Sequence, residues 1–199
     1  SIPAAYAFAR FTFPFKNLVF FIILFGRSVP PISVVIPYYF LFGALGLRSA
    51  DFVLGQWIGL ILMHITLTVP LIMFVLTGFF GSIPKDFDRA ARLDGCSRSQ
   101  LFRKVLLPTA APGIAACAIL TFLTSWNEML FGLIIGGTAS FHTLPAAIAA
   151  PLFGVGSDVT LMTGIASISL VPPIIAAIFL QKYITRLKIV DPVAIESSI

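Results

Sequence analysis

Three consecutive residues with useful chemistry, Trp126, Asn127 and Glu128, interrupt an apolar stretch in the second half of the chain. An amide and a carboxylate can hydrogen-bond the hydroxyl groups of a small solute such as a sugar. An indole ring can stack on the apolar face of a sugar ring. We therefore treat this triplet as a candidate lining for a transport pathway.

Two further ionisable residues, Arg27 and His64, also lie inside apolar stretches. Charged side chains at membrane depth are costly, and they usually face a cavity or a partner. Arg27 and Glu128 could pair with each other inside a helical bundle, or Glu128 could contact the solute, and the sequence leaves both explanations open. For His64 we expect a hydrogen bond within the bundle. No metal site is predicted from these residues, and the separated Cys96 and Cys117 favour reduced thiols.

The composition explains why these polar residues stand out. Of the 199 residues, 58% are hydrophobic and only 11% are charged, and the mean hydropathy is +1.02. Soluble domains carry about 25% charged residues, and a chain of this length cannot hide so much apolar surface in its own core. We expect an all-α integral membrane protein that forms one polytopic unit over residues 1–199. The net charge of +5 does not indicate a nucleic-acid partner, because the basic residues flank apolar stretches.

Four apolar segments are long enough to cross a bilayer, which takes about 20 residues. They run over 17–42, 52–80, 113–135 and 159–183. Residues 1–9 are too few to span, and we expect them to be the end of an earlier helix of a longer protein. The segment 144–155 favours an interfacial or re-entrant helix. The proline pairs at 30–31 and 172–173 are expected to kink or break the first and fourth segments, either beside a transport pathway or for structural reasons alone.

The basic residues predict the orientation of these segments. Of the 13 Lys and Arg residues, all except Arg27 and Arg48 lie before the first segment, between the second and third, or from the end of the fourth onward. Lys and Arg are enriched on the cytoplasmic side of membrane proteins. The start of the chain, the segment 82–108 and the C-terminus are therefore predicted to be cytoplasmic. The loops 43–51 and 136–158 are predicted to face outward.

The cytoplasmic segment 82–108 has a detailed helix code. Ser82 is predicted to cap a first helix that has Pro84 in its first turn and Asp86 and Asp88 near its positive end. A solvated basic loop that only enforces topology would not need this code. We therefore favour a folded helix-turn-helix unit, although the simpler topology signal remains an alternative.

The second half of this segment repeats the pattern of start and stop signals. Gly95 is predicted to end the first helix in a left-handed conformation. Ser97 and Gln100 have the spacing of a capping box for the second helix. Pro108 and Pro112 are predicted to end that helix before the third apolar segment.

This segment resembles a known family. The pair Ala90-Ala91, then Gly95 after three intervening residues, then Val105-x-Leu107-Pro108 after nine intervening residues, is similar to the "EAA" loop of ABC-importer permeases. Other stretches resemble the carbohydrate-type permeases related to the smaller membrane subunit of the maltose transporter. They are AAYAFARFTF (4–13), IPYYFLFGALGL (36–47), GFFGSIPKDFDRAARLDG (78–95), SWNEMLFGL (125–133) and TLPAAI (143–148).

The resemblance implies a membrane permease subunit of an ATP-driven sugar importer in a prokaryotic inner membrane, surrounded by lipid. Such permeases have six membrane helices, and the first and most of the second are missing from this chain. The implied partners are a cytoplasmic ATPase dimer that binds ATP and Mg, a second homologous permease and an extracytoplasmic sugar-binding protein. The chain itself is then not an enzyme and binds no cofactor.

The resemblance also implies that the 82–108 loop docks into a cleft of the ATPase and transmits its closure to the membrane helices. The residues assigned to this coupling loop are Asp88, Arg89, Ala90, Ala91, Asp94, Gly95, Leu107 and Pro108. Arg89 stands where the family usually has Glu, so that residue's ion-pair role is not transferred. Either Asp86 or Asp88 supplies the acid instead, or the cleft carries it.

Two other classes of function remain as alternatives. An ion-coupled secondary transporter could use Arg27, His64 and Glu128 as a relay, but it leaves the folded cytoplasmic unit unexplained. A membrane enzyme has less support, because His64 and His142 lie in different parts of the chain. The chain has no GxxxxGK[ST] phosphate-binding loop, so ATP would have to act through a partner.

Overall fold

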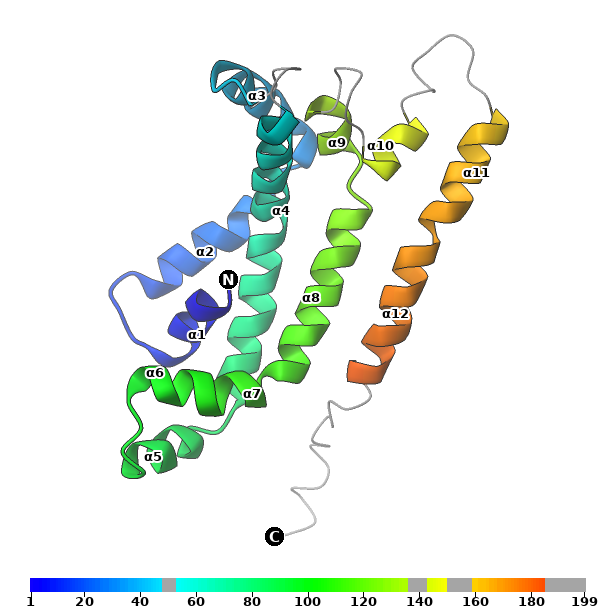
Figure 1. Ribbon diagram of the computed structural model, residues 1–199. Coiled ribbons are helices and arrows are strands. Elements are labelled where there is room, and N and C mark those ends of the chain that lie inside the picture. Colours follow the sequence, from blue (N-terminus) through cyan, green and yellow to red (C-terminus); the bar gives the residue numbers. More distant parts are fainter. Residues whose placement is uncertain (48–52, 136–142, 150–158, 185–199) are drawn as a thin grey trace.

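The computed structural model describes residues 1–47, 53–135, 143–149 and 159–184. In these ranges the secondary structure is helical, with no strand (Figure 1). In lipid the backbone has no water to bond to, and a helix satisfies its amides and carbonyls internally. The prediction of an all-α membrane fold is confirmed. The outward loops predicted at 43–51 and 136–158 lie largely outside the described residues, as does the end of the chain.

The long helix α4 (Val53–Ser82) forms the axis of the molecule. Its 30 residues correspond to about 45 Å at a rise of about 1.5 Å per residue, and the stretch Leu54–Ser82 is apolar enough to cross a membrane. Helices α1 (Ile2–Arg10), α2 (Lys16–Gly26) and α8 (Ala111–Trp126) contact it directly (Figure 1). The second predicted segment is therefore one continuous span.

The first predicted segment is not one straight helix. Helices α2 and α3 (Pro31–Ala44) meet at an angle of 90°. The break lies at the proline pair, because the residue before a proline is disfavoured in a helix and Pro31 suits the first position of the next one. The prediction that this pair breaks the segment is confirmed, and by length and composition the segment counts as a span only as a bent pair of helices.

The third predicted segment, 113–135, is also interrupted. Helix α8 ends at Trp126, and α9 (Leu130–Ile135) begins after three non-helical residues. Further along, α10 (Leu144–Ala149) is a short helix, as expected for this part of 144–155. The rest of that segment lies outside the described residues.

The fourth predicted segment contains α11 (Val159–Ser169) and α12 (Val171–Ile184). The stretch Met162–Phe179 is long and apolar enough to cross a membrane as one helix. By length and composition the described chain holds two spanning helices, or up to four if each bent pair of helices is one span.

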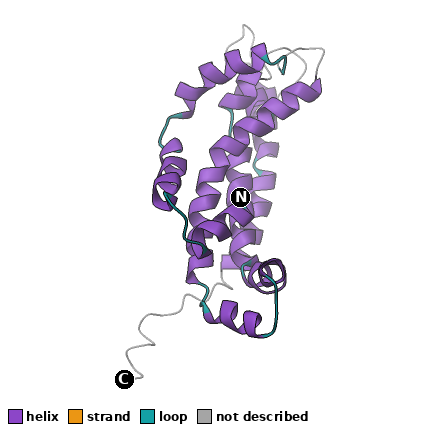
Figure 2. Cartoon of the chain, turned by 90° about the vertical axis from the view of Figure 1, so that its left-hand side faces the viewer, coloured by secondary structure: helices purple, strands orange, loops and turns teal. Residues whose placement is uncertain are grey.

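Between α4 and α8 the chain forms a compact helical unit at one end of the bundle (Figure 2). It consists of α5 (Asp86–Leu93) followed by one helical run over 98–109, and we call it the α5–α7 unit. The run is assigned as α6 (Arg98–Gln100), the π-helix η1 (Leu101–Leu106) and α7 (Leu107–Thr109). It meets α8 at 71°. The predicted helix, turn and helix are present.

Two clusters of buried side chains hold these helices together. The lower core joins α1, the end of α4, the α5–α7 unit and the start of α8, around Phe80, Leu101 and Leu106. The upper core joins α3, α4 and α9 around Met63 and Phe131. The α5–α7 unit is therefore continuous with the membrane bundle through shared packing.

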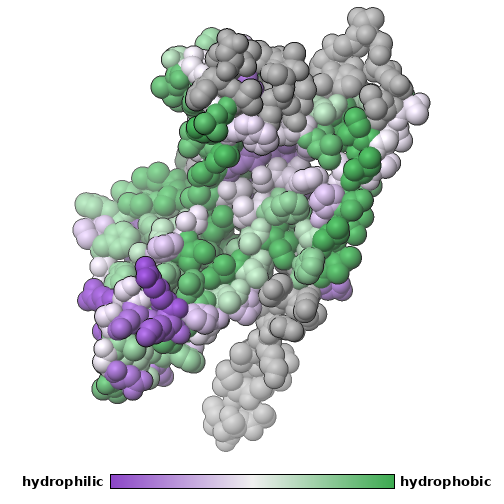
Figure 3. Space-filling view, in the orientation of Figure 1, coloured by the Kyte–Doolittle hydropathy of each residue, from purple (hydrophilic) through white to green (hydrophobic). Residues whose placement is uncertain are grey.

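The surface of the membrane helices differs in polarity from that of the α5–α7 unit. Large apolar side chains are exposed along α2, α4, α11 and α12, as lipid-facing or partner-facing helices require. Figure 3 shows hydrophobic residues along the α11–α12 side and hydrophilic residues gathered over α5 and α6.

Helices α4 and α8 approach closely at Gly113, which gives a first prediction. A Cβ atom at this position would lie 2.7 Å from the Phe79 ring. We expect Gly113→Ala to lower the free energy of unfolding by about 1–3 kcal/mol, because the core would be overpacked. The melting temperature of the detergent-purified protein measures this. Gly78→Ala is the control, since nothing lies within 4 Å of its added Cβ. Equal melting temperatures for the two variants would show that the helices can separate without cost.

Candidate functional site

The α5–α7 unit is attached through its inner face. Ala91 (6% exposed), Leu101 (1%) and Leu106 (0%) are buried in the lower core. The outer face carries Leu93, which is 89% exposed, and Phe87, which is 46% exposed. The unit therefore exposes two large apolar side chains among charged ones, while its inner side packs against the bundle.

The turn between its two helices follows the sequence code closely. Gly95 has φ +77°, as predicted. The amide of Cys96 donates to the Ala91 carbonyl (2.9 Å) and that of Gly95 to the Arg92 carbonyl (3.1 Å), which is the Schellman pattern. Ser97 then begins the capping box, in which its side chain accepts from the Gln100 amide and its amide donates to the Gln100 side chain.

Two details of the prediction are wrong. Ser82 does not cap α5, because α4 extends to Ser82 and its hydroxyl donates to the Phe79 carbonyl. Pro108 does not end the second helix, which continues to Thr109. The π-helix just before Pro108 changes the bonding register, since the Leu107 amide donates to the Phe102 carbonyl. A proline, which lacks an amide hydrogen, then fits inside the helix.

An ion pair with little exposure joins this unit to α1. Arg10 Nε lies 3.5 Å from Asp88 Oδ2, with the two side chains 5% and 16% exposed. Arg10 also donates to the Ile83 carbonyl at 2.8 Å, where α4 ends. The guanidinium thus connects α1, the end of α4 and α5.

The other predicted residues of the unit lie on its outside. Arg89 pairs with Asp86 at 3.0 Å, with both side chains more than three quarters exposed. Ala90, Asp94 and Pro108 are exposed as well, and Leu107 is half-buried. Of the two acids considered in place of the family's Glu, Asp88 pairs with Arg10 of α1 and Asp86 pairs with Arg89.

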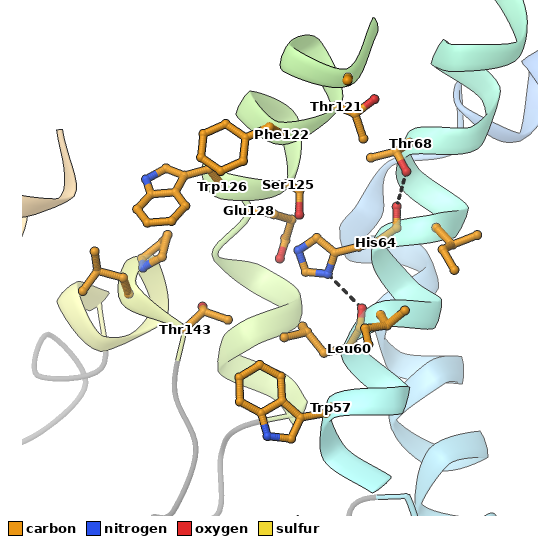
Figure 4. Close-up of a pocket in the computed structure, with 15 residues that line it drawn as sticks. Trp57, Leu60, His64, Thr68, Thr121, Phe122, Ser125, Trp126, Glu128 and Thr143 are labelled. Carbon is orange, nitrogen blue, oxygen red and sulfur yellow. Dashed lines mark hydrogen bonds between the residues drawn. The ribbon is translucent and has the colours of Figure 1, made fainter. Parts of the chain in front are cut away.

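A cavity of about 550 Å³ lies between α4, α8 and α10, and we call it the main cavity. Figure 4 shows its labelled side chains, which come from α4 (Trp57, Leu60, His64, Thr68), from α8 (Thr121, Phe122, Ser125, Trp126), and from the segments beyond α8 (Glu128, Thr143). Sites for small molecules commonly have volumes of about 300–1,000 Å³. The walls are mostly apolar, with polar groups from several helices converging on the interior.

Of the three residues predicted to line a transport pathway, Trp126 and Glu128 line this cavity. Trp126 lines it, with its indole N–H donating to the Ser169 carbonyl (3.2 Å) and its ring packed against Phe122. Glu128 lines it too, and its two oxygens accept from the amides of Leu130 and Phe131, each at 2.9 Å. Glu128 therefore satisfies free amides at the start of α9.

Asn127 lies elsewhere. It is exposed, outside the lining of this cavity, and its side-chain amide donates to the Leu123 carbonyl at 2.9 Å, at the end of α8. The structure thus brings Trp126 and Glu128 together and separates Asn127 from them.

Arg27 and His64, the two other ionisable residues of the apolar stretches, lie at different cavities. Arg27 lines a different cavity of about 310 Å³ and donates to the Leu67 carbonyl at 3.3 Å, so the considered pairing with Glu128 is not formed. His64 lines the main cavity with Glu128. Its Nδ1 lies 2.8 Å from the Leu60 carbonyl one turn earlier. The expected hydrogen bond exists, but within its own helix.

Several lining residues were missed by the sequence analysis: Trp57, Thr68, Thr121, Ser125 and Thr143. A signal was present, since Thr121, Ser125 and Glu128 lie four and three residues apart, and Trp57, His64 and Thr68 lie seven and four apart. Residues at these spacings share one face of a helix. Within the described ranges, no group of three or more His, Cys, Asp or Glu side chains could hold a metal ion.

Residues 1–189 match the family of the binding-protein-dependent transport system inner membrane component. The trehalose transport system permease protein SugB of Mycobacterium tuberculosis is 42% identical over 146 residues, which are 73% of this chain and 51% of SugB. The osmoprotective compounds uptake permease protein GgtD of Synechocystis is 34% identical over 184 residues, 92% of this chain and 60% of GgtD. The chain thus spans about half to three fifths of these relatives.

A solved structure shares the fold. The crystal structure of a bacterial ABC transporter involved in the import of the acidic polysaccharide alginate superposes with a TM-score of 0.68. The match covers 92% of this chain and 66% of that one, at 23% sequence identity. The arrangement of helices described above is therefore that of a known membrane transport fold.

The ion pair between α1 and α5 generates a second prediction. Asp88→Asn leaves the Arg10 guanidinium in a poorly exposed site without a counter-charge, so we expect a loss of about 3 kcal/mol in unfolding free energy. Asp86→Asn makes the same chemical change in the exposed pair and should cost less than about 0.5 kcal/mol. Thermal unfolding in detergent compares the two. A similar melting temperature for both variants would mean that Arg10 holds α5 through packing alone.

Proposed function

Because the chain belongs to the family of binding-protein-dependent transport system inner membrane components, we propose that it forms part of a permease subunit of an ATP-driven importer for a sugar or polyol. The permease works by alternating access. Its family membership and apolar helices make it a multi-pass membrane protein. The identity of the solute and of the partners belongs to the proposal.

The observation that carries the proposal is the two-sided α5–α7 unit. Its inner face shares the lower core with α1, α4 and α8, so the unit moves with the bundle. Its outer face presents Phe87 and Leu93 beside the small side chain of Ala90. We propose that this face docks into a cleft of a cytoplasmic ATPase, which carries ATP and Mg.

Energy would then pass through contacts described above. When two ATPase domains close on ATP, they displace the docked unit. The Arg10–Asp88 pair and the lower core transfer that displacement to α1 and to the ends of α4 and α8. Since α4 and α8 also wall the main cavity, their relative movement changes the side from which it is open. Hydrolysis of ATP resets the helices.

The cavity supports a sugar or polyol as solute. Two indole rings, Trp57 and Trp126, line it together with the hydroxyl groups of threonine and serine side chains. Two relatives are named for transport of trehalose and of osmoprotective compounds. A second homologous permease would complete the pathway, and a sugar-binding protein would deliver the solute on the outer side. The distribution of basic residues supports a cytoplasmic position for the α5–α7 unit and the C-terminus.

The alternative, an ion-coupled transporter that uses Arg27, His64 and Glu128 as a relay, has weaker support. His64 and Glu128 share the main cavity, but Arg27 lines another one. A relay through all three would have to cross the packing between the two cavities.

A third prediction tests the proposed function. The full-length protein, tagged at its C-terminus, is purified from its native membrane, and the co-purifying ATPase activity is measured. Leu93→Asp places a charge on the docking face, and we expect it to lower the recovered ATPase at least about tenfold, a loss of about 1.4 kcal/mol in binding. Leu93→Met keeps the apolar contact and should behave as wild type. Because Leu93 is 89% exposed, neither change disturbs the isolated fold.

Uptake assays in cells separate the two candidate functions. Accumulation of radiolabelled trehalose or maltose should stop when arsenate depletes ATP and should fall with Leu93→Asp. Uptake that is abolished by a protonophore without depletion of ATP, and that is unaffected by the substitution, would favour the ion-coupled transporter and reject the importer.

A further inference from the structure

We propose that the main cavity selects a neutral, polyhydroxylated solute and rejects anionic sugars, because its polar wall is rich in hydrogen-bond acceptors and its lining carries one carboxylate and no Lys or Arg. This inference rests on the proposed function and specifies the chemical class of solute that the cavity accepts. It follows from the direction of each hydrogen bond around the cavity.

The threonine hydroxyls of the wall have already used their hydrogens. Thr68 donates to the His64 carbonyl and Thr121 to the Cys117 carbonyl, each at 2.7 Å and each one turn back along its own helix. A hydroxyl has one hydrogen and two lone pairs. With the hydrogen committed to the backbone, both side chains offer acceptors to the cavity.

The ring N–H groups of His64 and Trp126 are also committed. The Leu60 carbonyl can only accept, so His64 Nδ1 carries the hydrogen of their 2.8 Å bond. Figure 4 shows the Nε2 edge of the ring turned toward Glu128. The indole N–H of Trp126 donates to the Ser169 carbonyl, which leaves its ring face for stacking.

Glu128 adds a carboxylate to the same wall. Each oxygen accepts one backbone amide, and an ionised carboxylate has about four acceptor positions, so it can also accept from a solute. The fifteen residues that line the cavity, all within the described part of the chain, include no Lys or Arg. Nothing in this lining compensates a second negative charge.

The donors and acceptors that remain free on the wall determine which groups of a solute the cavity can bind. Sugar hydroxyls can donate to Glu128 and to the hydroxyl oxygens of Thr68 and Thr121. Ser125 and Thr143 keep hydroxyl hydrogens that no described residue accepts, so they can serve an ether or ring oxygen of the sugar. A uronate or sugar phosphate brings acceptors and negative charge to a wall of acceptors, which leaves groups unpaired and repels Glu128.

A fourth prediction tests this directly, by binding instead of uptake. The complete importer is purified without its binding protein, and saturation-transfer-difference NMR titrations give a dissociation constant for each probe. The probes are trehalose, maltose, sucrose and sorbitol, each with the acid formed by oxidising its primary hydroxyl groups. At least one neutral probe should bind, and its acid should bind at least about tenfold more weakly.

Two substitutions on α8 provide the matched comparison. Thr121→Val keeps the shape but removes an acceptor, so the best neutral probe should bind about 5- to 30-fold more weakly, the usual effect of an unpaired hydroxyl. Thr124→Val deletes the same kind of bond, from the hydroxyl to the Leu120 carbonyl, on a residue outside the cavity lining. It should leave binding unchanged and controls for folding.

The outcomes distinguish this inference from the proposed function. Acids that bind as tightly as their neutral parents, equal effects of the two valine variants, or no binding of any neutral probe would each overturn the inference. ATP-dependent uptake in the earlier assays could still hold in those cases, and the proposed function would stand without it. Loss of ATP-dependent uptake with the predicted binding pattern intact would reject the proposed function instead.

Discussion

In a bilayer, every backbone amide and carbonyl that leaves a helix needs a partner from the protein, and the architecture of this chain depends on how that need is met. Where α8 stops, the carboxylate of Glu128 accepts the amides that open α9. At the break between α2 and α3, Arg27 reaches the Leu67 carbonyl. Both of these interruptions therefore have a polar side chain that bonds to the backbone, in one case that of the neighbouring helix α4, and each borders a cavity.

At the other end of the bundle, polar contacts of one buried side chain fix the α5–α7 unit to the membrane helices. Arg10 is almost entirely buried, yet it meets both a carboxylate and a carbonyl. Buried charges are stable only when they are paired and hydrogen-bonded in this way. The result is a fixed junction between three helices, which lets a unit outside the apolar bundle act as part of it.

Local signals in the sequence predicted the local structure well. Gly95, Ser97 and Gln100 have the predicted roles, because turn and cap chemistry involves residues a few positions apart. The same kind of reasoning failed at Ser82 and Pro108. There the outcome depended on how far α4 continued and on a change of bonding register, which packing decides.

Features that depend on contacts between distant residues were harder to predict. Hydropathy located the apolar segments, but the 90° angle between α2 and α3 needs the neighbouring helices to define it. The Arg10–Asp88 pair joins residues 78 positions apart in the numbering, and no spacing rule connects them. In the cavity, Trp126 and Glu128 were found because they are unusual, whereas Thr68 and Thr121 were overlooked because threonine is ordinary in membrane helices.

The placement of the aromatic residues has a spectroscopic consequence. The sequence contains two tryptophans, and both line the main cavity, on different helices. Indole emission shifts with the polarity and hydration of its surroundings, so the light from this part of the protein comes from the cavity walls. The wavelength of tryptophan emission therefore reports whether the main cavity is hydrated, dry or filled by a solute.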